Sequence, residues 1–424
     1  MTAKKTLNPV TLHYEFGGKL GAFAISLAVP FFTYWMNIVC NEQTGCRISR
    51  TIFDLHVLWA QTKFFSLEAC ALYLAWYLFI MACWWWLPGR WVEGTVLRDG
   101  SRLKYKINAF PTFIATTILI GMILWVFGFP PFVYVIEHYI ELITASLVMS
   151  ILQAFYCYWS SFQSNRLLAL GGNSGNFIYD WFIGRELNPR IGSFDIKTFN
   201  EMRPGLILWA LLDFCWIVKQ ASNFGRISNS ILLTFGFQLW YVFDAEINED
   251  TILTQMDITT DGFGFMLSVG DLTWVPFTYS LQLVYLSFHP IDLTTSQLGG
   301  ILLVQLIGYY IFRTSNEEKN NFRVKQSNPK KLTFIETKRG TKLLTSGWWG
   351  RSRHPNYLGD WIMAWAWCLP TGFQTPITYF YVIYFAILLI HRQLRDEEAC
   401  EQKYGADWTR YRKIVPWRII PYLY

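Results

Sequence analysis

Residues 109–129 read AFPTFIATTILIGMILWVFGF, a stretch of 21 residues without a charged side chain. A helix of ~20 apolar residues is long enough to cross the hydrocarbon core of a membrane. The rest of the chain has the same character, because 53% of its 424 residues are hydrophobic and only 16% are charged. A soluble domain usually carries about 25% charged residues. The stretch and the composition together predict an all-α, polytopic integral membrane protein.

Similar apolar blocks recur on both sides of this stretch, and we expect about ten transmembrane helices. We place them near residues 20–40, 65–87, 109–129, 138–159, 204–219, 228–243, 264–288, 297–312, 357–370 and 374–391. Two of the blocks are short for a span, which suggests broken or tilted helices around a cavity. We find no internal repeat. We therefore expect a single membrane domain over 1–424 that includes a short cytosolic head at 1–16.

Basic residues gather in the loops 88–108, 160–203 and 313–353 and in the C-terminal tail. Because basic loops stay on the cytosolic side, these loops and an even number of spans predict that both termini are cytosolic. The third loop is the most basic: Arg313, Lys319, Arg323, Lys325, Lys330, Lys331, Lys338, Arg339, Lys342, Arg351 and Arg353. Because the basic charge is confined to particular loops, nucleic acid is not an expected partner.

Common cofactor and metal motifs are missing from the sequence. No GxGxxG follows a strand and no GxxxxGK[ST] occurs, so a bound nucleotide would not be held by a Rossmann domain. The six histidines are scattered and the eight cysteines form no CxxC pair, which argues against a metal site. Cys40 and Cys46 can pair if their loop is lumenal, and the sequence leaves this open.

A second stretch, GWWGRSRHPNYLGD at residues 347–360, concentrates groups that bind ligands or donate protons. It lies between the most basic loop and an apolar, Trp-rich helix. A polar cluster at such a boundary is costly to keep without a use, so we take it as a candidate site that includes His354. The alternative is a loop whose Arg and His side chains anchor at the lipid headgroups.

Lys319 and Arg323, in Lys319-Asn-Asn-Phe-Arg323, are four residues apart and would point the same way from a helix. Two cations on one helix face can hold phosphate groups. The alternative is anchoring of the basic loop at the membrane surface. This pair by itself supports both interpretations equally.

The segment 391–411 continues an apolar block and is expected to be helical. Polar and aromatic residues recur in it at intervals of four, four, four and three: Asp396, Cys400, Tyr404, Trp408 and Tyr411. They form one stripe if the helix runs through Gly405. An acid and two phenols beside aromatic rings can wall a cofactor site. The alternative is an exposed helix end held by salt bridges, since Arg392 and Asp396 also pair at i, i+4.

Carboxylates in or near the apolar blocks are a third set of candidates: Glu68, Glu137, Glu141, Asp213, Asp244, Asp271 and Asp360. An ionisable group at membrane depth is by default a functional-site hypothesis. Burial keeps a carboxyl group protonated, so that it can donate a proton. Tyr241 and Asp244 end one expected span, at the expected mouth of a cavity. Some members of the set are expected only to cap helices.

Several motifs along the chain together carry a family resemblance. They are Tyr14-Glu-Phe-Gly-Gly18, Gly184-Arg-Glu-Leu-Asn-Pro-Arg190, Arg203-Pro-Gly205, Met256-Asp-Ile258, Asp261-Gly-Phe-Gly-Phe-Met-Leu267, Gly270-Asp-Leu-Thr-Trp-Val-Pro276, Lys319-Asn-Asn-Phe-Arg323, Ser346-Gly-Trp-Trp-Gly350, Arg353-His-Pro-Asn-Tyr357 and the segment from Arg395 to Tyr411. On these motifs the chain closely resembles the sterol reductase family, which includes sterol C14 reductases, the membrane domain of lamin B receptor and 7-dehydrocholesterol reductase.

The resemblance covers nearly the whole chain and favours one branch of the family. Pro355 is more similar to the C14 reductases and lamin B receptor than to 7-dehydrocholesterol reductase. The chain begins almost at once with the membrane domain and lacks the long chromatin-binding region of lamin B receptor. We therefore expect a Δ14-sterol reductase of ergosterol biosynthesis.

The resemblance implies an endoplasmic reticulum enzyme that reduces a sterol ring double bond with NADPH. It implies an NADPH-binding portion at 314–424, with a pocket that faces the cytosol. The matching cofactor positions are Lys319, Arg323, Leu344, Trp349, Asn356, Tyr357, Asp396, Cys400, Tyr404 and Tyr411. An isolated C14=C15 double bond must be protonated before it accepts hydride, and Asp396 and Tyr241 are the candidates for the acid and its relay. Asp396 has an open alternative role, which is to position the nicotinamide amide.

Three other functions stay open from the sequence. One is reduction of another ring double bond, such as Δ7. Another is an isoprenylcysteine-type membrane methyltransferase, which the C-terminal third alone resembles. The third is a non-catalytic sterol-binding protein, which would be expected to have lost the cofactor residues. The expected partners are a sterol substrate and membrane lipid, with other sterol-biosynthesis enzymes as a further open case.

Overall fold

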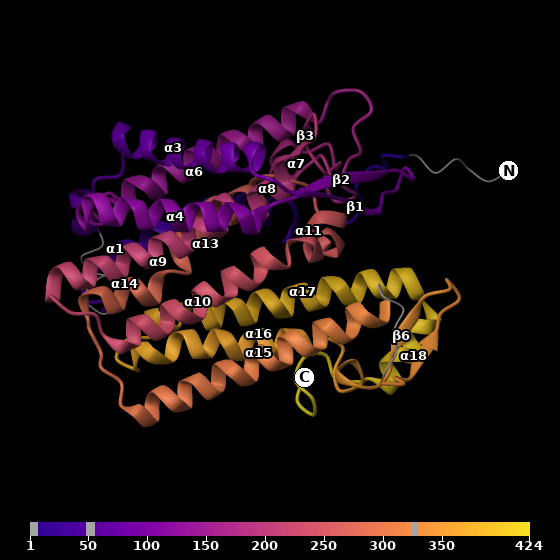
Figure 1. The fold of residues 1–424 in the computed structure, drawn as a ribbon. Helices are drawn as coiled ribbons and strands as arrows, with labels where there is room; N and C mark the ends of the chain where they lie inside the picture. The colour runs from indigo at the N-terminus through magenta and orange to yellow at the C-terminus, as the bar shows by residue number, and fades with distance from the viewer. Residues whose placement is uncertain (1–6, 48–55, 324–329) are drawn as a thin grey trace. The chain divides into compact units, whose positions relative to one another are not determined.

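The computed structural model describes residues 7–47, 56–323 and 330–424. Residues 1–6 of the expected polar head and Lys325 of the basic loop lie outside these residues. The chain divides into two compact units, unit 1 at Met1–Pro290 and unit 2 at Ile291–Tyr424, and each is described by itself (Figure 1). The expected single domain and its cofactor portion at 314–424 stay predictions.

Unit 1 is built on long helices from the most apolar segments of the chain. These are α1 (Gly18–Val39), α3 (Leu67–Trp86), α4 (Ala109–Phe127), α6 (Tyr139–Ser160), α9 (Pro204–Phe224) and α10 (Asn229–Ile247). α9 lies at the centre of their packing, against α10 and several short helices. Pro204 is the first residue of α9. A backbone N–H at this position has no partner within the helix, so a proline there costs no hydrogen bond.

Shorter elements connect the long helices of unit 1. They are α5 (Pro130–Glu137), α7 (Phe177–Ile183), α8 (Ile196–Met202), the 3₁₀ turn η1 (Glu249–Thr254), α11 (Met256–Thr259), α12 (Phe265–Val269), the π-helical turn η2 (Gly270–Trp274), α13 (Val275–Thr278) and α14 (Leu281–Phe288). The expected span near 264–288 is therefore a chain of short helices. Pro276, which lacks a backbone donor, prevents an unbroken α-helix there.

Two small hairpins in unit 1 depart from the all-α prediction. The strands β1 (Arg90–Val96) and β2 (Arg102–Ile107) pair antiparallel, with a register shift between Glu93 and Val96. The strands β3 (Arg190–Ile191) and β4 (Phe194–Asp195) form a second, minimal pair. Both lie in segments expected to be polar loops, where turn residues allow a hairpin to close.

Unit 2 consists of three long helices followed by a compact C-terminal end. In chain order it contains α15 (Thr295–Arg323), β5 (Phe334–Glu336), β6 (Lys342–Leu344), the 3₁₀ turn η3 (Trp348–Gly350), α16 (Pro355–Cys368), the 3₁₀ turns η4 (Leu369–Thr371) and η5 (Ile377–Tyr379), α17 (Phe380–Tyr404) and α18 (Ala406–Ile414). Strands β5 and β6 pair antiparallel. In Figure 1, α15, α16 and α17 run beside one another, in agreement with their contacts.

Close approach of α15 and α16 depends on two glycines. A Cβ added to Gly359 would lie 2.5 Å from the backbone nitrogen of Phe312, and one added to Gly308 would lie 2.8 Å from the carbonyl oxygen of Gly359. Small residues allow helix backbones to approach closely inside a membrane. This crossing sets the distance between the basic end of α15 and the start of α16.

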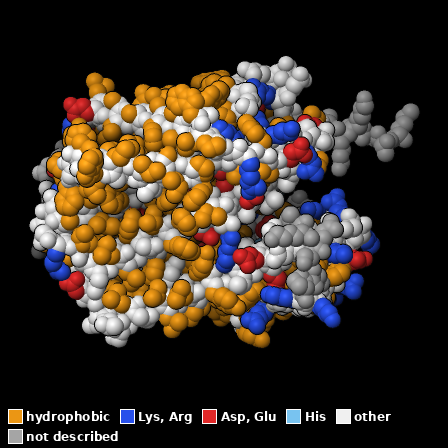
Figure 2. Space-filling model, viewed as in Figure 1, with side chains coloured by type: hydrophobic (Ala, Val, Ile, Leu, Met, Phe, Trp, Pro, Cys, Tyr) orange, Lys and Arg blue, Asp and Glu red, His pale blue; other side chains and the backbone are white. Residues whose placement is uncertain are grey.

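Within the described residues, seven helical segments are long and apolar enough to cross a membrane: Gly18–Val39, Leu67–Trp86, Ala109–Phe127, Tyr139–Ser160, Ile196–Phe224, Thr295–Arg323 and Ile377–Tyr404. They point to a helical, multi-pass membrane protein, whereas the expected count of about ten is not confirmed. Figure 2 shows hydrophobic side chains over the long helices, whereas Lys and Arg gather over the end of unit 2 that carries β6 and α18. Cys40 and Cys46 form a disulfide, which settles the pairing that the sequence left open.

Candidate functional site

All ten predicted cofactor residues lie in unit 2, on six of its elements. Helix α15 carries Lys319 and Arg323, β6 ends at Leu344, and η3 contains Trp349. Asn356 and Tyr357 open α16, while the remaining residues come from the end of α17 and from α18: Asp396, Cys400, Tyr404 and Tyr411. The candidate site is therefore built at one end of unit 2 from segments that are distant in sequence.

Trp349 connects the basic end of α15 to α18. The Lys319 Nζ atom lies over the Trp349 ring, 4.1 Å from its centroid, a geometry that favours a cation–π interaction. The indole Nε1 of Trp349 donates to the Ser315 carbonyl oxygen at 2.9 Å, and the Tyr411 hydroxyl donates to the Trp349 carbonyl oxygen at 3.3 Å. These contacts fix the position of the Lys319 ammonium group.

Glu318, the neighbour of Lys319, holds the turn that leads to Trp349. Its buried carboxylate accepts from the Trp348 backbone N–H at 2.8 Å and lies 3.4 Å from the Lys330 Nζ atom. Gly347 has a φ of +67°, and a Cβ there would lie 2.4 Å from the Glu318 Oε1 atom. A residue with a side chain would therefore meet both backbone strain and a clash. The sequence analysis did not select Glu318. The glycines of the Gly347-Trp-Trp-Gly350 turn are the one signal in the sequence that another side chain packs closely against this backbone.

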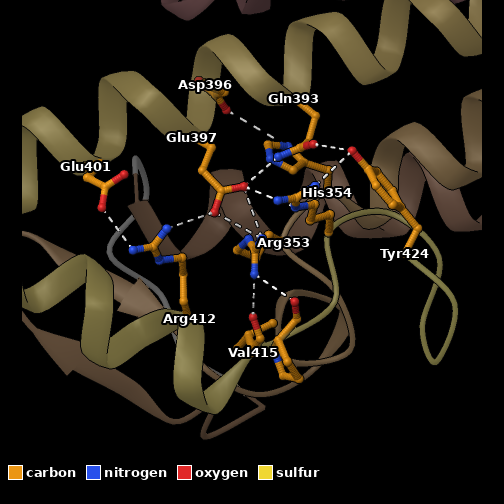
Figure 3. Close-up of polar contacts among 11 residues, drawn as sticks. Arg353, His354, Gln393, Asp396, Glu397, Glu401, Arg412, Val415 and Tyr424 are labelled. Atoms are coloured by element: carbon orange, nitrogen blue, oxygen red, sulfur yellow. Dashed lines mark hydrogen bonds and ion pairs between the residues drawn. The ribbon is translucent and has the colours of Figure 1, made fainter.

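Arg353 and Glu397 form the centre of a buried ionic network, shown in Figure 3. One Arg353 amino group donates to both Glu397 oxygens at 3.1 Å, and the other donates to two backbone carbonyl oxygens near Val415 at 2.9 Å. The Gln393 amide also donates to Glu397, at 2.7 Å. Arg412 and Arg418 lie 3.7 and 3.5 Å from the same carboxylate.

This network ties the C-terminal tail to α16 and α17. The backbone N–H groups of Arg353 and His354 donate to the carbonyl oxygens of Trp417 and Arg418. The Tyr424 hydroxyl donates to the Gln393 Oε1 atom at 3.1 Å. The sequence analysis did not select Glu397 because its arginine partners come from other segments, and no local spacing indicates them.

His354 lies beneath α17, next to the predicted acid (Figure 3). Burial, together with the nearby cations Lys319, Arg353 and Arg392, lowers the pKa of His354 to about 3. The imidazole is therefore neutral near pH 7. Its Nδ1 atom is 3.9 Å from the Asp396 Oδ2 atom, too long for a hydrogen bond. The ring instead stacks on Tyr357, with centroids 4.8 Å apart.

The expected stripe from Asp396 to Tyr411 does not lie on one continuous helix. Helix α17 ends at Tyr404, Gly405 has a φ of +53°, and α18 begins at Ala406. That condition of the prediction is wrong because Gly405 combines its positive φ with a ψ of −119°, a conformation that leaves the helix and that L side chains rarely adopt. The residues still gather, since Trp408 and Tyr411 pack in one buried cluster against which Cys400 and Tyr404 lie.

Tyr411 is a buried member of this cluster. Burial raises the pKa of its phenol to about 12, although the nearby Arg353 and Arg323 act in the opposite direction. The hydroxyl group is therefore neutral near pH 7 and serves as a hydrogen-bond donor to Trp349.

The residues present fit an anionic cofactor. Among the residues that the structure describes, no carboxylate lies within ion-pair distance of Lys319 or Arg323. The Asn356 Oδ1 atom is buried and accepts no hydrogen bond within the same part of the chain. Two cations without a carboxylate partner can hold phosphate oxygens, and a buried unmatched acceptor indicates a missing donor. An amide-bearing, phosphorylated ligand satisfies both conditions.

The predicted residue Tyr241 lies on α10 of unit 1, with its ring 6.1 Å from that of Trp209. Its pairing with Asp396 of unit 2 stays a prediction. Some candidate carboxylates have local structural contacts instead. Glu141 lies 3.5 Å from the Lys63 Nζ atom, and Glu68 accepts from the Tyr134 hydroxyl at 3.2 Å.

Comparison with known proteins supports a single assignment. The model of the ergosterol biosynthesis ERG4/ERG24 family matches residues 10–424. The chain is 47% identical over 429 residues to Delta(14)-sterol reductase erg24 of Schizosaccharomyces pombe, covering 100% of both chains. It is 45% identical to Delta(14)-sterol reductase ERG24 of Saccharomyces cerevisiae and 43% identical to that of Candida albicans, with 99% of each chain covered. Because the match runs through both units, the protein belongs to the ergosterol biosynthesis ERG4/ERG24 family of sterol reductases.

Proposed function

We propose that this protein is an NADPH-dependent Δ14-sterol reductase of the endoplasmic reticulum membrane. The observation that carries the proposal is the full-length match to relatives named Delta(14)-sterol reductase. The arrangement of unit 2 supports it, since its cations and unmatched acceptor suit a phosphorylated, amide-bearing cofactor.

Lys319 and Arg323 would hold the NADPH phosphates. Trp349 keeps the Lys319 ammonium in place through the ring beneath it, so the cation is positioned before any ligand binds. Asn356 would accept a hydrogen bond from the cofactor, because its Oδ1 atom is otherwise unmatched. Leu344, Tyr357, Cys400, Tyr404 and Tyr411 would line the remaining wall. When bound, NADPH supplies the hydride for the reduction.

The protein must supply a proton to the sterol. A C14=C15 double bond without a neighbouring carbonyl group accepts hydride only after protonation produces a tertiary cation at C14. Asp396 is the proposed acid, with Tyr241 of unit 1 as the proposed relay. The Asp396 side chain is 42% exposed, so water can reach it, and the His354 Nδ1 atom is 3.9 Å away, too far to occupy the carboxyl group with a hydrogen bond. Aromatic faces would stabilise the sterol cation.

The proposed topology has about ten spans, with both termini and the basic loops in the cytosol. Helix α10 and the shorter helices α14 and α16 would provide the spans beyond the seven apolar segments. The end of unit 2 that carries Lys319 and Arg323 would then face cytosolic NADPH.

Sterol product analysis in a yeast strain that lacks its own C14 reductase tests the proposed function. Expression of this chain should remove Δ14 sterols from that strain. The purified protein should oxidise NADPH only when a Δ14 sterol is present. Reduction of a Δ7 or Δ24(28) bond with the Δ14 bond left intact would contradict the assignment.

A further inference from the structure

Residues 418–424 form a closed turn that no step of the proposed reaction uses. The backbone N–H groups of Arg418 and Ile419 donate to the carbonyl oxygen of Tyr424, at 2.7 and 3.0 Å. The Tyr424 N–H donates in turn to the Ile420 carbonyl oxygen at 3.0 Å. The backbone of Tyr424 therefore closes the turn from both of its hydrogen-bonding groups.

The Tyr424 side chain joins this turn to α17, as Figure 3 shows. Its hydroxyl donates to the Gln393 Oε1 atom at 3.1 Å and accepts from the Arg418 Nη1 atom at 3.1 Å. The other end of the Gln393 amide donates to Glu397 at 2.7 Å, and the Arg418 Nε atom lies 3.5 Å from the same carboxylate. The four side chains thus form a closed ring of polar contacts. Gln393 is fully buried, so water cannot replace the phenol as the donor to its oxygen.

The turn and the ring both hold the chain just before α16. The backbone N–H groups of Arg353 and His354 donate, at 2.9 and 2.8 Å, to the carbonyl oxygens of residues 417 and 418, where the turn begins. Glu397, which belongs to the ring, binds the Arg353 guanidinium group. The first turn of α16 follows directly and carries Asn356 and Tyr357. A displaced turn would therefore displace the part of the candidate site that these two residues form.

We propose that Tyr424 is a positioning residue of the candidate cofactor site. Its backbone fixes the turn 418–424, and its hydroxyl fixes the Glu397 carboxylate through Gln393, so that α16 begins at the place where Asn356 can meet the cofactor. The identity of that cofactor as NADPH rests on the proposed function. The role falls on a residue outside the ten predicted cofactor positions, because its contacts reach the site only through other residues.

Hydrogen exchange of the purified protein in lipid nanodiscs tests the positioning without any cofactor. Tyr424→Phe removes only the hydroxyl group and keeps the ring and the backbone. Peptides that cover residues 353–357 should exchange about fivefold faster, the factor that corresponds to one lost hydrogen bond. Tyr422→Phe is the matched control in the same turn. The Tyr422 side chain is 86% exposed, and its hydroxyl makes no hydrogen bond with the described residues, so this variant should leave the exchange unchanged.

Calorimetric titration with NADPH in the absence of sterol measures the consequence for the cofactor. The Kd should rise about fivefold in the Tyr424→Phe protein, with an unchanged number of binding sites per protein. A residue that only keeps the protein folded would instead lower the number of sites and leave the Kd unchanged. Gln393→Met breaks the same ring from α17 and keeps the length of the side chain. Because the hydroxyl acts through Gln393, adding Tyr424→Phe to this variant should raise the Kd by less than about twofold.

Four results would overturn the inference. They are unchanged exchange at 353–357 in the Tyr424→Phe protein, equal effects of Tyr424→Phe and Tyr422→Phe, a full effect of Tyr424→Phe that persists beside Gln393→Met, and fewer binding sites at an unchanged Kd. A failure of the proposed function looks different, because the unsubstituted protein would then not bind NADPH. The exchange measurement would still decide the role of Tyr424 in that case.

Discussion

Replacement of Glu397 by Gln should strongly destabilise unit 2. The substitution keeps the shape of the side chain but removes the charge that Arg353 contacts twice at 3.1 Å. The side chains of Arg353 and Glu397 are only 4% and 11% exposed, so water cannot replace the lost partner. Breaking a buried ion pair by removing one charge typically costs about 3–5 kcal/mol. The new amide group would also face the donors of Gln393, Arg412 and Arg418.

Thermal unfolding of the purified protein in detergent, followed by tryptophan fluorescence, measures this effect. The midpoint of the transition assigned to unit 2 should fall by about 10 °C or more. Glu401→Gln is the matched control, because it makes the same chemical change about one helical turn further along α17. Glu401 pairs with Arg412 at 2.9 Å but is 53% exposed. Its substitution should change stability by no more than about 1 kcal/mol.

Two results would refute this reasoning. One is a Glu397→Gln protein that unfolds within a degree or two of the unsubstituted protein. The other is an equal loss of stability in the Glu397→Gln and Glu401→Gln proteins. Either result would mean that the Arg353 charge is compensated by its carbonyl contacts near Val415 rather than by the carboxylate.

Three further predictions concern the cofactor, pH and the disulfide. Arg323→Ala should mainly raise the KM for NADPH, whereas Asp396→Asn should mainly lower kcat; steady-state kinetics with equal effects on both parameters in both variants would contradict this division of roles. The folded-state pKa of His354, about 3, is below its unfolded value of about 6.5, so its contribution to stability is present above pH ~6.5 and declines toward pH ~3. Unfolding midpoints measured across this range should depend less on pH in a His354→Gln protein. Cys40→Ser should lower unfolding stability by about 2 kcal/mol, and Cys70→Ser, which changes a free thiol, is the control expected to leave it nearly unchanged.

The residues that the sequence analysis selected for the candidate site stay a prediction, whereas their local structure can be compared with the fold. The four-residue spacing correctly placed Lys319 and Arg323 on one helix, since a helical turn is nearly four residues long. The same spacing rule misjudged the segment around Gly405, because a periodic pattern continues in a sequence even where the helix ends. The apolar segment 264–288 was also expected as one span, and hydrophobicity alone does not reveal the break near Pro276.

By itself, the sequence determined that this is a helical membrane protein, and it predicted a basic, aromatic candidate site near the C-terminus, because hydrophobic length and local spacing are properties of consecutive residues. Only the tertiary structure decided what holds that site together. Glu397 and Arg353 are 44 positions apart, and Trp349 is fixed by Ser315 and Tyr411 from opposite sides of the sequence. Such partners are selected by burial and geometry after the helices pack, since a buried charge needs its counterion wherever the fold brings one.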